Sequence, residues 1–252
     1  FSSPETEIGY WQLASSCNGI SEACRALDTP VTGGNVSLYN ESIDESGKTT
    51  PIQPTPVIGM VGVIEDVGKA VGTGWRNLND EIWIIGSSSS EGSLAASSYL
   101  EYFHGLIEGR PPQINLNDEK VIQKIVRLGI LEGLICSCHD VSDGGLAISL
   151  AECCILSSKG ANIFLQDEKR IDNLLFNEGG SRFLLSIDKH KIKLWEEFYT
   201  KQKYKINDLI YIRKIGYVTD ESLNIKYQDN EISNIKISTL ADKFNKGLTL
   251  NF

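Results

Sequence analysis

Residues 30–41 read PVTGGNVSLYNE, and the rest of the chain is organised around this stretch. Its apolar start predicts a short strand, which opens at once into Gly33 and Gly34. Paired glycines let a backbone come close to a ligand, because no Cβ stands in the way. Asn35 offers a carbonyl oxygen of the kind that Mg²⁺ accepts, and Ser37 offers a hydroxyl to a phosphate or substrate oxygen. Taken alone, these residues indicate a plain hairpin or bulge more strongly than a ligand site.

The bulk composition is that of an ordinary globular protein. A chain of 252 residues can bury a large core, and its length predicts one or two domains. The net charge of −9 and the lack of a basic run argue against a protein that binds nucleic acid. The sequence shows no signal peptide and no apolar run of the ~18 residues needed to span a membrane.

The cysteines favour a reducing compartment, the cytoplasm, because their pattern is typical of small buried hydrophobic residues. They are Cys17, Cys24, Cys136, Cys138, Cys153 and Cys154. The sequence Cys136-Ser-Cys138-His139 suggests a metal site, but its spacing is not that of structural zinc sites and further ligands are not evident. Because the first residue is Phe1 rather than Met, we expect the chain to be a piece of something longer.

In the first quarter of the chain, the apolar spacing predicts a helix from Glu5 to Leu27. The polar stretch 40–55, with one glycine and two prolines, is predicted to be a long loop, which is usually functional or mobile. Residues 56–65 read PVIGMVGVIE and predict a buried strand, rich in β-branched residues. The glycine-containing connector 67–80 is the predicted domain boundary.

The remainder alternates irregularly between predicted strands and helices, which favours an α+β fold of mixed layers. The predicted strands are 81–86, 134–138, 163–165, 183–187, 210–212 and 215–218. The predicted helices are 94–106, 118–134, 146–156 and 189–204. Asn117 is the predicted N-cap of the second of these helices. Beyond residue 204 we expect only short strands and polar loops.

Two glycine turns carry further candidate residues. The first, HDVSDGG at residues 139–145, follows a predicted strand and opens a predicted helix, an arrangement that presents backbone N–H groups to an anion. Asp140 and Asp143 are the candidate functional residues of this turn. An equally good interpretation is that Asp143 is simply the cap of the helix. The second turn, LFNEGGSR, contains Glu178 and Arg182. Arg182 suits bidentate contact with a phosphate. An ion pair with Glu178 inside the same turn is an equally good interpretation.

Several segments together resemble phosphoribosylformylglycinamidine synthase, the ATP-dependent amidine-forming ligase of purine biosynthesis. They are FSSPETEIGYWQL, PVTGGNVSLYNE, TPVIGMVGVIEDV, SCHDVSDGGLAISLAE and LFNEGGSRFLLS, in the family's order. The resemblance covers nearly the whole chain and fades after about Lys189. It implies an AIR synthase-like fold, in which residues 1–70 are the C-terminal part of an N-terminal-type, ATP-binding domain. Residues 71–252 would then form a complete C-terminal-type α/β domain.

The family uses ATP and ammonia to convert the amide of formylglycinamide ribotide into an amidine. The resemblance places Gly34 against ATP, Asn35 on Mg²⁺ and Ser37 on the substrate. It also implies that the catalytic His and the principal magnesium carboxylates lie in a first half of the protein that is absent here. We therefore expect no catalytic residue in this chain and no activity without that half. The other implied partners are a glutaminase subunit and a small accessory subunit.

By this resemblance, the two glycine turns would be second-half counterparts of first-half loops that contact substrate. They either form a functional site or are structural remnants of one. The sequence departs from the family at three positions. Cys138 stands where Ala is more usual, Asn177 where Gly commonly precedes the Glu, and Gly33 where Ser is often found. The change at Asn177 weakens the case for an active second turn.

Two other classes of function remain. Related ATP-using enzymes include aminoimidazole ribotide synthetase, selenophosphate synthetase, thiamine-monophosphate kinase and a hydrogenase-maturation protein, which lack the sequence GNVSLYNE. The second class is a non-catalytic ATP-binding or assembly module. A His-containing first half on the same polypeptide would favour the enzyme over the module.

Overall fold

The computed structural model describes residues 1–88, 93–202 and 208–247. The chain divides into two compact units, Phe1–Glu65 and Asp66–Phe252. The last two residues of the helix predicted over 189–204 lie outside the described residues. Among the residues that are described, no helix is long and apolar enough to cross a membrane.

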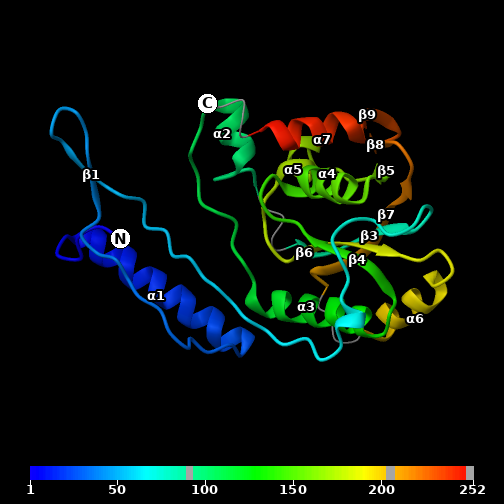
Figure 1. Cartoon of the computed structure of the whole chain (residues 1–252), viewed down its shortest axis with the longest axis horizontal. Helices are drawn as coiled ribbons and strands as arrows, with labels where there is room; N and C mark the ends of the chain where they lie inside the picture. The colour runs from blue at the N-terminus through cyan, green and yellow to red at the C-terminus, as the bar shows by residue number, and fades with distance from the viewer. Residues whose placement is uncertain (89–92, 203–207, 248–252) are drawn as a thin grey trace. The chain divides into compact units, whose positions relative to one another are not determined.

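The first unit contains one long helix, α1 (Glu7–Leu27), which confirms the predicted helix (Figure 1). It begins two residues later than predicted because Thr6 is its N-cap. The Thr6 hydroxyl accepts a hydrogen bond from the Gly9 N–H at 3.1 Å, which satisfies one of the free donors of the first turn. The helix ends at Asp28, whose backbone is left-handed.

The loop predicted over 40–55 contains a hairpin, so that prediction is wrong in part. Strands β1 (Glu41–Ile43) and β2 (Thr49–Pro51) pair antiparallel. The Asp44 carboxylate organises the turn by accepting from the backbone N–H groups of Ser46 and Lys48, both at 2.9 Å. Gly47 adopts a φ of 81°, which glycine tolerates without steric cost.

The strands predicted at the start of 30–41 and over 56–65 are both absent, and these predictions are wrong. Neither segment has regular secondary structure, and Val61 is 101% exposed. A strand needs a neighbouring strand to satisfy its backbone hydrogen bonds. No other segment among the described residues pairs with either stretch, so β-branched composition alone does not make a strand.

The second unit is built on a sheet of seven strands within its described part. They are β3 (Glu81–Ser87), β4 (Ile135–Asp140), β5 (Gly160–Leu165), β6 (Arg182–Ile187), β7 (Ile210–Thr219), β8 (Ser222–Tyr227) and β9 (Asn230–Lys236). Their order is β4-β6-β3-β7-β5-β8-β9. Neighbours are antiparallel, except that β5 and β8 are parallel. The strands predicted near 81, 134, 163 and 183 are confirmed.

Helices cover both faces of this sheet, which confirms the mixed α/β layers. They are α2 (Ser98–His104), α3 (Leu116–Leu131), α4 (Gly145–Ser157), α5 (Ile171–Phe176), α6 (Ile192–Gln202) and α7 (Ile237–Lys246), with a 3-10 turn at Val67–Lys69. Figure 1 shows α4, α5 and α7 on one side of the sheet and α3 and α6 on the other.

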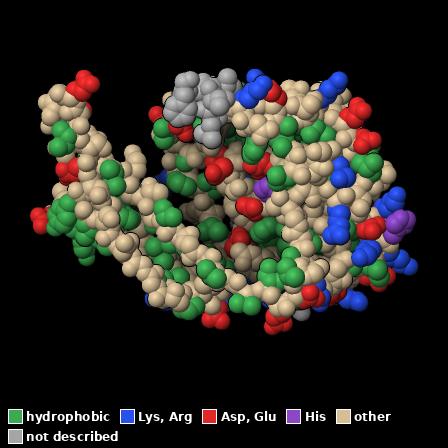
Figure 2. All heavy atoms as spheres, in the orientation of Figure 1, with side chains coloured by type: hydrophobic (Ala, Val, Ile, Leu, Met, Phe, Trp, Pro, Cys, Tyr) green, Lys and Arg blue, Asp and Glu red, His purple; other side chains and the backbone are tan. Residues whose placement is uncertain are grey.

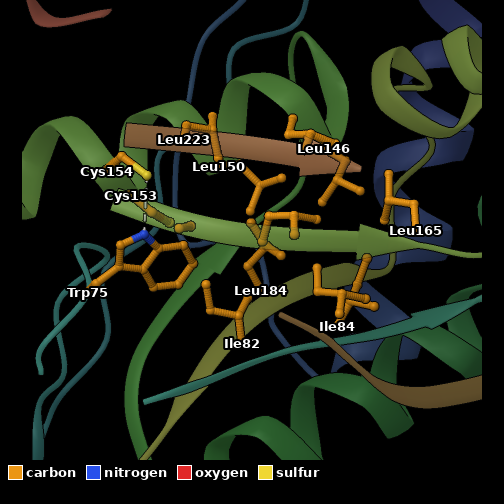
Figure 3. Packing of buried hydrophobic residues seen from close by; sticks show 14 of the residues in the cluster. Trp75, Ile82, Ile84, Leu146, Leu150, Cys153, Cys154, Leu165, Leu184 and Leu223 are labelled. Atoms are coloured by element: carbon orange, nitrogen blue, oxygen red, sulfur yellow. Dashed lines mark hydrogen bonds between the residues drawn. The ribbon is translucent and has the colours of Figure 1, made fainter. Parts of the chain in front are cut away.

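Each face of the sheet has its own apolar core. On the α4 side, Leu150 and Leu184 are fully buried, and the Trp75 indole N–H donates to the Cys154 sulfur at 3.4 Å (Figure 3). On the α3 side, Trp195 is fully buried and packs edge-on against Trp83, with ring centroids 6.2 Å apart. The two cores fix the sheet from which the glycine turns project.

Several details of the second unit differ from the sequence predictions, and the helix predicted over 94–106 is the shorter α2. The N-cap of α3 is Asn115 rather than Asn117, because the Asn115 side chain accepts from the N–H groups of residues 117 and 118. The strands predicted at 210–212 and 215–218 form one strand, β7, with a bulge opposite Ile82 and Trp83. Helices α5 and α7 were not predicted at all.

Candidate functional site

The glycine-rich stretch lies in the first unit, between α1 and β1. Its C-terminal part is held by backbone hydrogen bonds to the first two residues. The Phe1 nitrogen donates to the Ser37 carbonyl at 2.8 Å, and the Asn40 N–H donates to the Phe1 carbonyl at 3.1 Å. The Tyr39 N–H donates to the Ser2 carbonyl at 3.3 Å. Residues 37–40 are therefore anchored, and this anchored segment begins three residues after Gly34.

Gly33 and Gly34 have open surroundings. A Cβ added at either residue would have no heavy atom within 4 Å, and neither backbone has a positive φ of the left-handed range. The hairpin or bulge interpretation is wrong here, because the segment has no regular secondary structure. Within the described residues, neither packing nor conformation requires glycine at these two positions. The pair fits a backbone that leaves room for a ligand.

Asn35 and Ser37 are exposed, and within the described chain neither side chain makes a hydrogen bond. Mg²⁺ takes near-octahedral oxygen ligands, usually with one or two carboxylates. Asn35 alone supplies one neutral oxygen, and no cluster of three or more His, Cys, Asp or Glu residues suited to a metal occurs among the described residues. The residues present therefore fit one ligand of a magnesium site rather than a whole site.

The second group of candidates lies in the second unit, where the structure brings the two glycine turns together. Strands β4 and β6 pair antiparallel, with Asp140 opposite Phe183. The Val141 N–H donates to the Arg182 carbonyl at 2.9 Å. The Asp140 side chain is 63% exposed at the end of its strand. Residues about 40 positions apart in the sequence thus meet at one end of the sheet.

Glu178 closes the N-terminus of helix α4. One of its carboxylate oxygens accepts from the Gly144 N–H at 2.7 Å and from the Ser98 N–H at 3.0 Å. Both N–H groups belong to helix starts, where the helix dipole favours a negative charge. The helix end that the sequence predicts as an anion site therefore already holds an anionic group of the chain itself.

The interpretation of Asp143 as the cap of α4 is wrong. The N-cap is Gly144, with a φ of 73° and no side-chain cap hydrogen bond. A side chain at Gly144 would meet Ile148, since its Cβ would lie 2.3 Å from a carbon of that residue. The glycine is required by both the backbone conformation and this close approach. Asp143 is exposed beside it.

Arg182 braces the second glycine turn. Its side chain is buried, at 4% exposure, and its Nε donates to the Gly179 carbonyl at 2.9 Å. A terminal guanidinium nitrogen donates to the Asn177 carbonyl at 2.5 Å. These bonds hold the turn that carries Glu178. The guanidinium supports the turn from within, whatever further contacts it makes.

A hollow of about 390 Å³ opens beside these turns, and its charged lining is mainly acidic. The carboxylates that line it are Glu119, Asp140, Asp143 and Glu178, with Arg182 as the cationic member. Glu119 also accepts from the Ser181 hydroxyl at 2.5 Å. Acidic side chains are visible on the face of this unit shown in Figure 2. Such a lining disfavours a phosphate that arrives without a cation.

The sequence reasoning missed Glu119 as a neighbour of the second glycine turn, where it contacts Ser181. Glu119 lies in the first turn of α3, about 60 residues before the turn that it contacts. The only signal in the sequence was an acidic residue at a helix start, which usually reflects the helix dipole alone.

The Cys138 thiol beside His139 lies in surroundings that disfavour its thiolate form. Burial, followed by the nearby Asp140 carboxylate, raises the pKa of Cys138 to about 12. Burial also raises the pKa of Cys136. The His139 ring lies between the Asp140 carbonyl, 2.6 Å from Nδ1, and Glu152, 3.3 Å from Nε2.

Comparison with known families gives two matches along the chain. Residues 79–223 match the AIR synthase related protein C-terminal domain, and residues 1–64 match the corresponding N-terminal domain. A phosphoribosylformylglycinamidine synthase subunit PurL from Prochlorococcus marinus (strain MIT 9312) is 60% identical over 250 residues. That match covers 99% of this chain and 32% of the relative, so the chain spans about a third of the relative's length.

Solved structures share the fold. Thermotoga maritima PurL complexed with FGAR superimposes with a TM-score of 0.57 at 16% identity, covering 69% of this chain and 30% of that one. The same protein complexed with ATP gives a TM-score of 0.53 at 16% identity, covering 69% and 28%. At this level of identity the likeness concerns the fold.

Proposed function

Because the chain belongs to the AIR synthase-related family, we propose that it is the C-terminal third of a phosphoribosylformylglycinamidine synthase. The observation that carries this proposal is the 60% identity to a PurL subunit along essentially the entire chain. The complete enzyme would convert formylglycinamide ribotide (FGAR), ATP and ammonia into formylglycinamidine ribotide, ADP and phosphate. In this proposal the catalytic groups lie outside the 252 residues.

The proposal divides the chain into two parts with different roles. Residues 1–70 form the C-terminal part of an ATP-binding domain of the N-terminal type, and residues 71–252 form a domain of the C-terminal type. The matches to the N-terminal and C-terminal family domains, at residues 1–64 and 79–223, support this division.

The proposed contribution of the first part is the glycine-rich stretch. Gly34 would lie against ATP, where its open surroundings leave space for a nucleotide. Ser37 would hydrogen-bond the substrate through its exposed hydroxyl, with its backbone fixed by the bond to Phe1. Asn35 would add one neutral oxygen to a Mg²⁺ site. When bound there, Mg²⁺ would neutralise charge on the phosphate oxygens during transfer.

For the second unit we propose a supporting role. The Glu178 carboxylate is engaged by two backbone N–H groups, and Arg182 is engaged by two carbonyls. Groups committed in this way hold the turns in place, and the acidic hollow beside them suits a cation better than a free phosphate. The same observation favours the alternative function, a non-catalytic ATP-binding or assembly module.

We further propose that the enzyme works in the cytoplasm as one component of a complex. A glutaminase subunit would supply ammonia, and the complex would also contain a small accessory subunit. The Prochlorococcus marinus relative is a synthase subunit, which supports an assembly of this kind.

The test uses the full-length protein with FGAR, Mg-ATP and ¹⁵N-ammonium. The expected result is one ADP for each ¹⁵N incorporated into the product, with no ADP release when FGAR is omitted. ADP release that does not depend on FGAR would reject the ligase in favour of a different ATP-using enzyme. A folded protein that leaves FGAR unchanged and releases no ADP would reject it in favour of the binding module.

A further inference from the structure

Tyr39 lies near the end of the glycine-rich stretch and has a left-handed backbone, with a φ of 58°. This conformation is common for glycine and rare for a bulky residue, because the Cβ then crowds the backbone. Residues of this kind persist only where their surroundings impose the conformation, and they cluster at functional sites. The neighbours of Tyr39 explain what imposes it here.

Two consecutive backbone N–H groups bind the same neighbouring segment at this point. The Tyr39 N–H donates to the Ser2 carbonyl at 3.3 Å, and the Asn40 N–H donates to the Phe1 carbonyl at 3.1 Å. In an extended strand, successive N–H groups would point to opposite sides. The left-handed conformation of Tyr39 allows both bonds and so joins residues 39–40 to residues 1–2.

The Tyr39 side chain adds a further link to the same part of the chain. Its hydroxyl donates to a carboxylate oxygen of Glu5 at 3.1 Å. This hydrogen bond and the negative charge of Glu5 raise the pKa of the Tyr39 phenol, so the hydroxyl remains a donor at neutral pH. Glycine would adopt the same backbone conformation without strain. The bond to Glu5 therefore explains why a tyrosine stands at this position.

Residues 1–5 are in turn packed closely on helix α1. Ser2 is buried. A Cβ at Gly9 would lie 2.0 Å from the Ser3 carbonyl oxygen and 2.9 Å from the Ser2 hydroxyl oxygen, so this close approach requires glycine. The helix thus fixes residues 1–5, and these residues fix Tyr39.

We propose that Tyr39 and Glu5 are positioning residues for Ser37, and this inference rests on the proposed function, in which Ser37 binds FGAR. Tyr39 lies two residues after Ser37, whose carbonyl accepts from the Phe1 nitrogen at 2.8 Å. The bond between Tyr39 and Glu5 holds the stretch against α1, so that the Ser37 hydroxyl is presented to the substrate in one position. ATP, which the proposed function places at Gly34, should depend less on this bond.

The test measures steady-state kinetics of the full-length protein with FGAR, Mg-ATP and ammonium. Tyr39→Phe removes only the hydroxyl and should raise the KM for FGAR about 5-fold, the usual effect of losing one hydrogen bond. The kcat should change by less than about 2-fold, because a contact made equally in the ground and transition states affects KM alone. The KM for Mg-ATP should stay the same. The matched control is Tyr10→Phe on α1, where the residue is 65% exposed, and it should leave all three constants unchanged.

A double-variant cycle tests whether the two residues act through one bond. Glu5→Gln keeps an acceptor oxygen and should leave the KM for FGAR within about 2-fold of the wild type, whereas Glu5→Leu should raise it about 5-fold. Combining Tyr39→Phe with Glu5→Leu should give no further increase, because both changes remove the same bond. Thermal unfolding of each variant should give a Tm close to that of the wild type.

Three results would overturn this inference while leaving the proposed function intact. The first is an unchanged KM for FGAR in Tyr39→Phe. The second is a double variant in which the two effects multiply to about 25-fold, as independent changes do. The third is a parallel loss of FGAR affinity, Mg-ATP affinity and thermal stability, which would indicate a structural role alone. A wild-type protein without FGAR-dependent turnover would instead reject the proposed function, and this inference with it.

Discussion

The carboxylate of Glu178 and the backbone N–H of Gly144 lie 2.7 Å apart, joining two turns that are 34 residues distant in sequence. The same carboxylate oxygen receives the Ser98 N–H at 3.0 Å. One side chain therefore accepts hydrogen bonds at the N-termini of both α2 and α4, and it fixes the position of the HDVSDGG turn. The anion-binding geometry predicted at this turn is present, and the anion that it binds is the Glu178 carboxylate of the chain itself.

Glu178→Gln should lower the free energy of unfolding by about 1–2 kcal/mol, because a neutral amide oxygen accepts these bonds more weakly than a carboxylate. Chemical denaturation of the wild type and the variant measures the difference. The exposed Glu197→Gln serves as the control and should change stability by less than about 0.5 kcal/mol. Equal stability of the two variants would contradict the bracing role of Glu178.

Asp140→Asn should change turnover of the full-length enzyme by no more than about 3-fold. The Asp140 side chain is exposed at the end of β4, and we propose a supporting rather than a catalytic role for its turn. Steady-state ADP release measures the effect. A loss of about 100-fold or more, on the scale of removing a catalytic acid or base, would show that the turn belongs to an active site.

Asn35→Ala should lower Mg-ATP-dependent turnover of the full-length enzyme by about 10-fold or more, as loss of a metal-site contact commonly does. Its stability should change little, because the Asn35 side chain makes no hydrogen bond within the described chain. Exposed Asn18 on α1 gives the matched control, Asn18→Ala. Parallel losses of turnover and thermal stability in Asn35→Ala would indicate a structural turn instead.

Cys138 should resist alkylation in the folded chain. The thiolate is the reactive form, and the pKa of Cys138 is raised to about 12, so its thiolate fraction stays small up to a pH of about 9. Cys17 is exposed on α1 and should react with iodoacetamide under the same conditions. Mass spectrometry of the labelled peptides separates the two sites. Labelling of Cys138 at the rate of Cys17 would refute the burial and the raised pKa.

The sequence was sufficient for the elements that carry their own pattern. Helix α1, helix α3 and strands β3 and β6 were all predicted, because apolar periodicity and turn residues report burial directly. Helix α7 also has such a pattern, with Ile237 and Leu240 packed against the core, but it is short and polar overall. That signal could have been found and was overlooked.

Features that depend on distant partners could not be predicted. The strand expected over 56–65 has the right residues but lacks a neighbouring strand among the described elements. The contact between Glu119 and Ser181 joins residues 62 positions apart, and no local pattern marks it. Glu178 and Arg182 were identified as candidates by motif, yet their bonding partners became visible only in the fold. The roles of Gly34, Asn35 and Ser37 stay a prediction.

ADP release from Mg-ATP, FGAR and ammonium would show whether the glycine-rich stretch belongs to a composite active site. It would be measured on this chain alone, on the remainder of the full-length protein alone, and on the two together. Circular dichroism verifies that each part is folded. We expect FGAR-dependent ADP release only from the mixture, because the glycine-rich stretch would contribute to a composite site. Activity from this chain alone, or a folded mixture without activity, would contradict it.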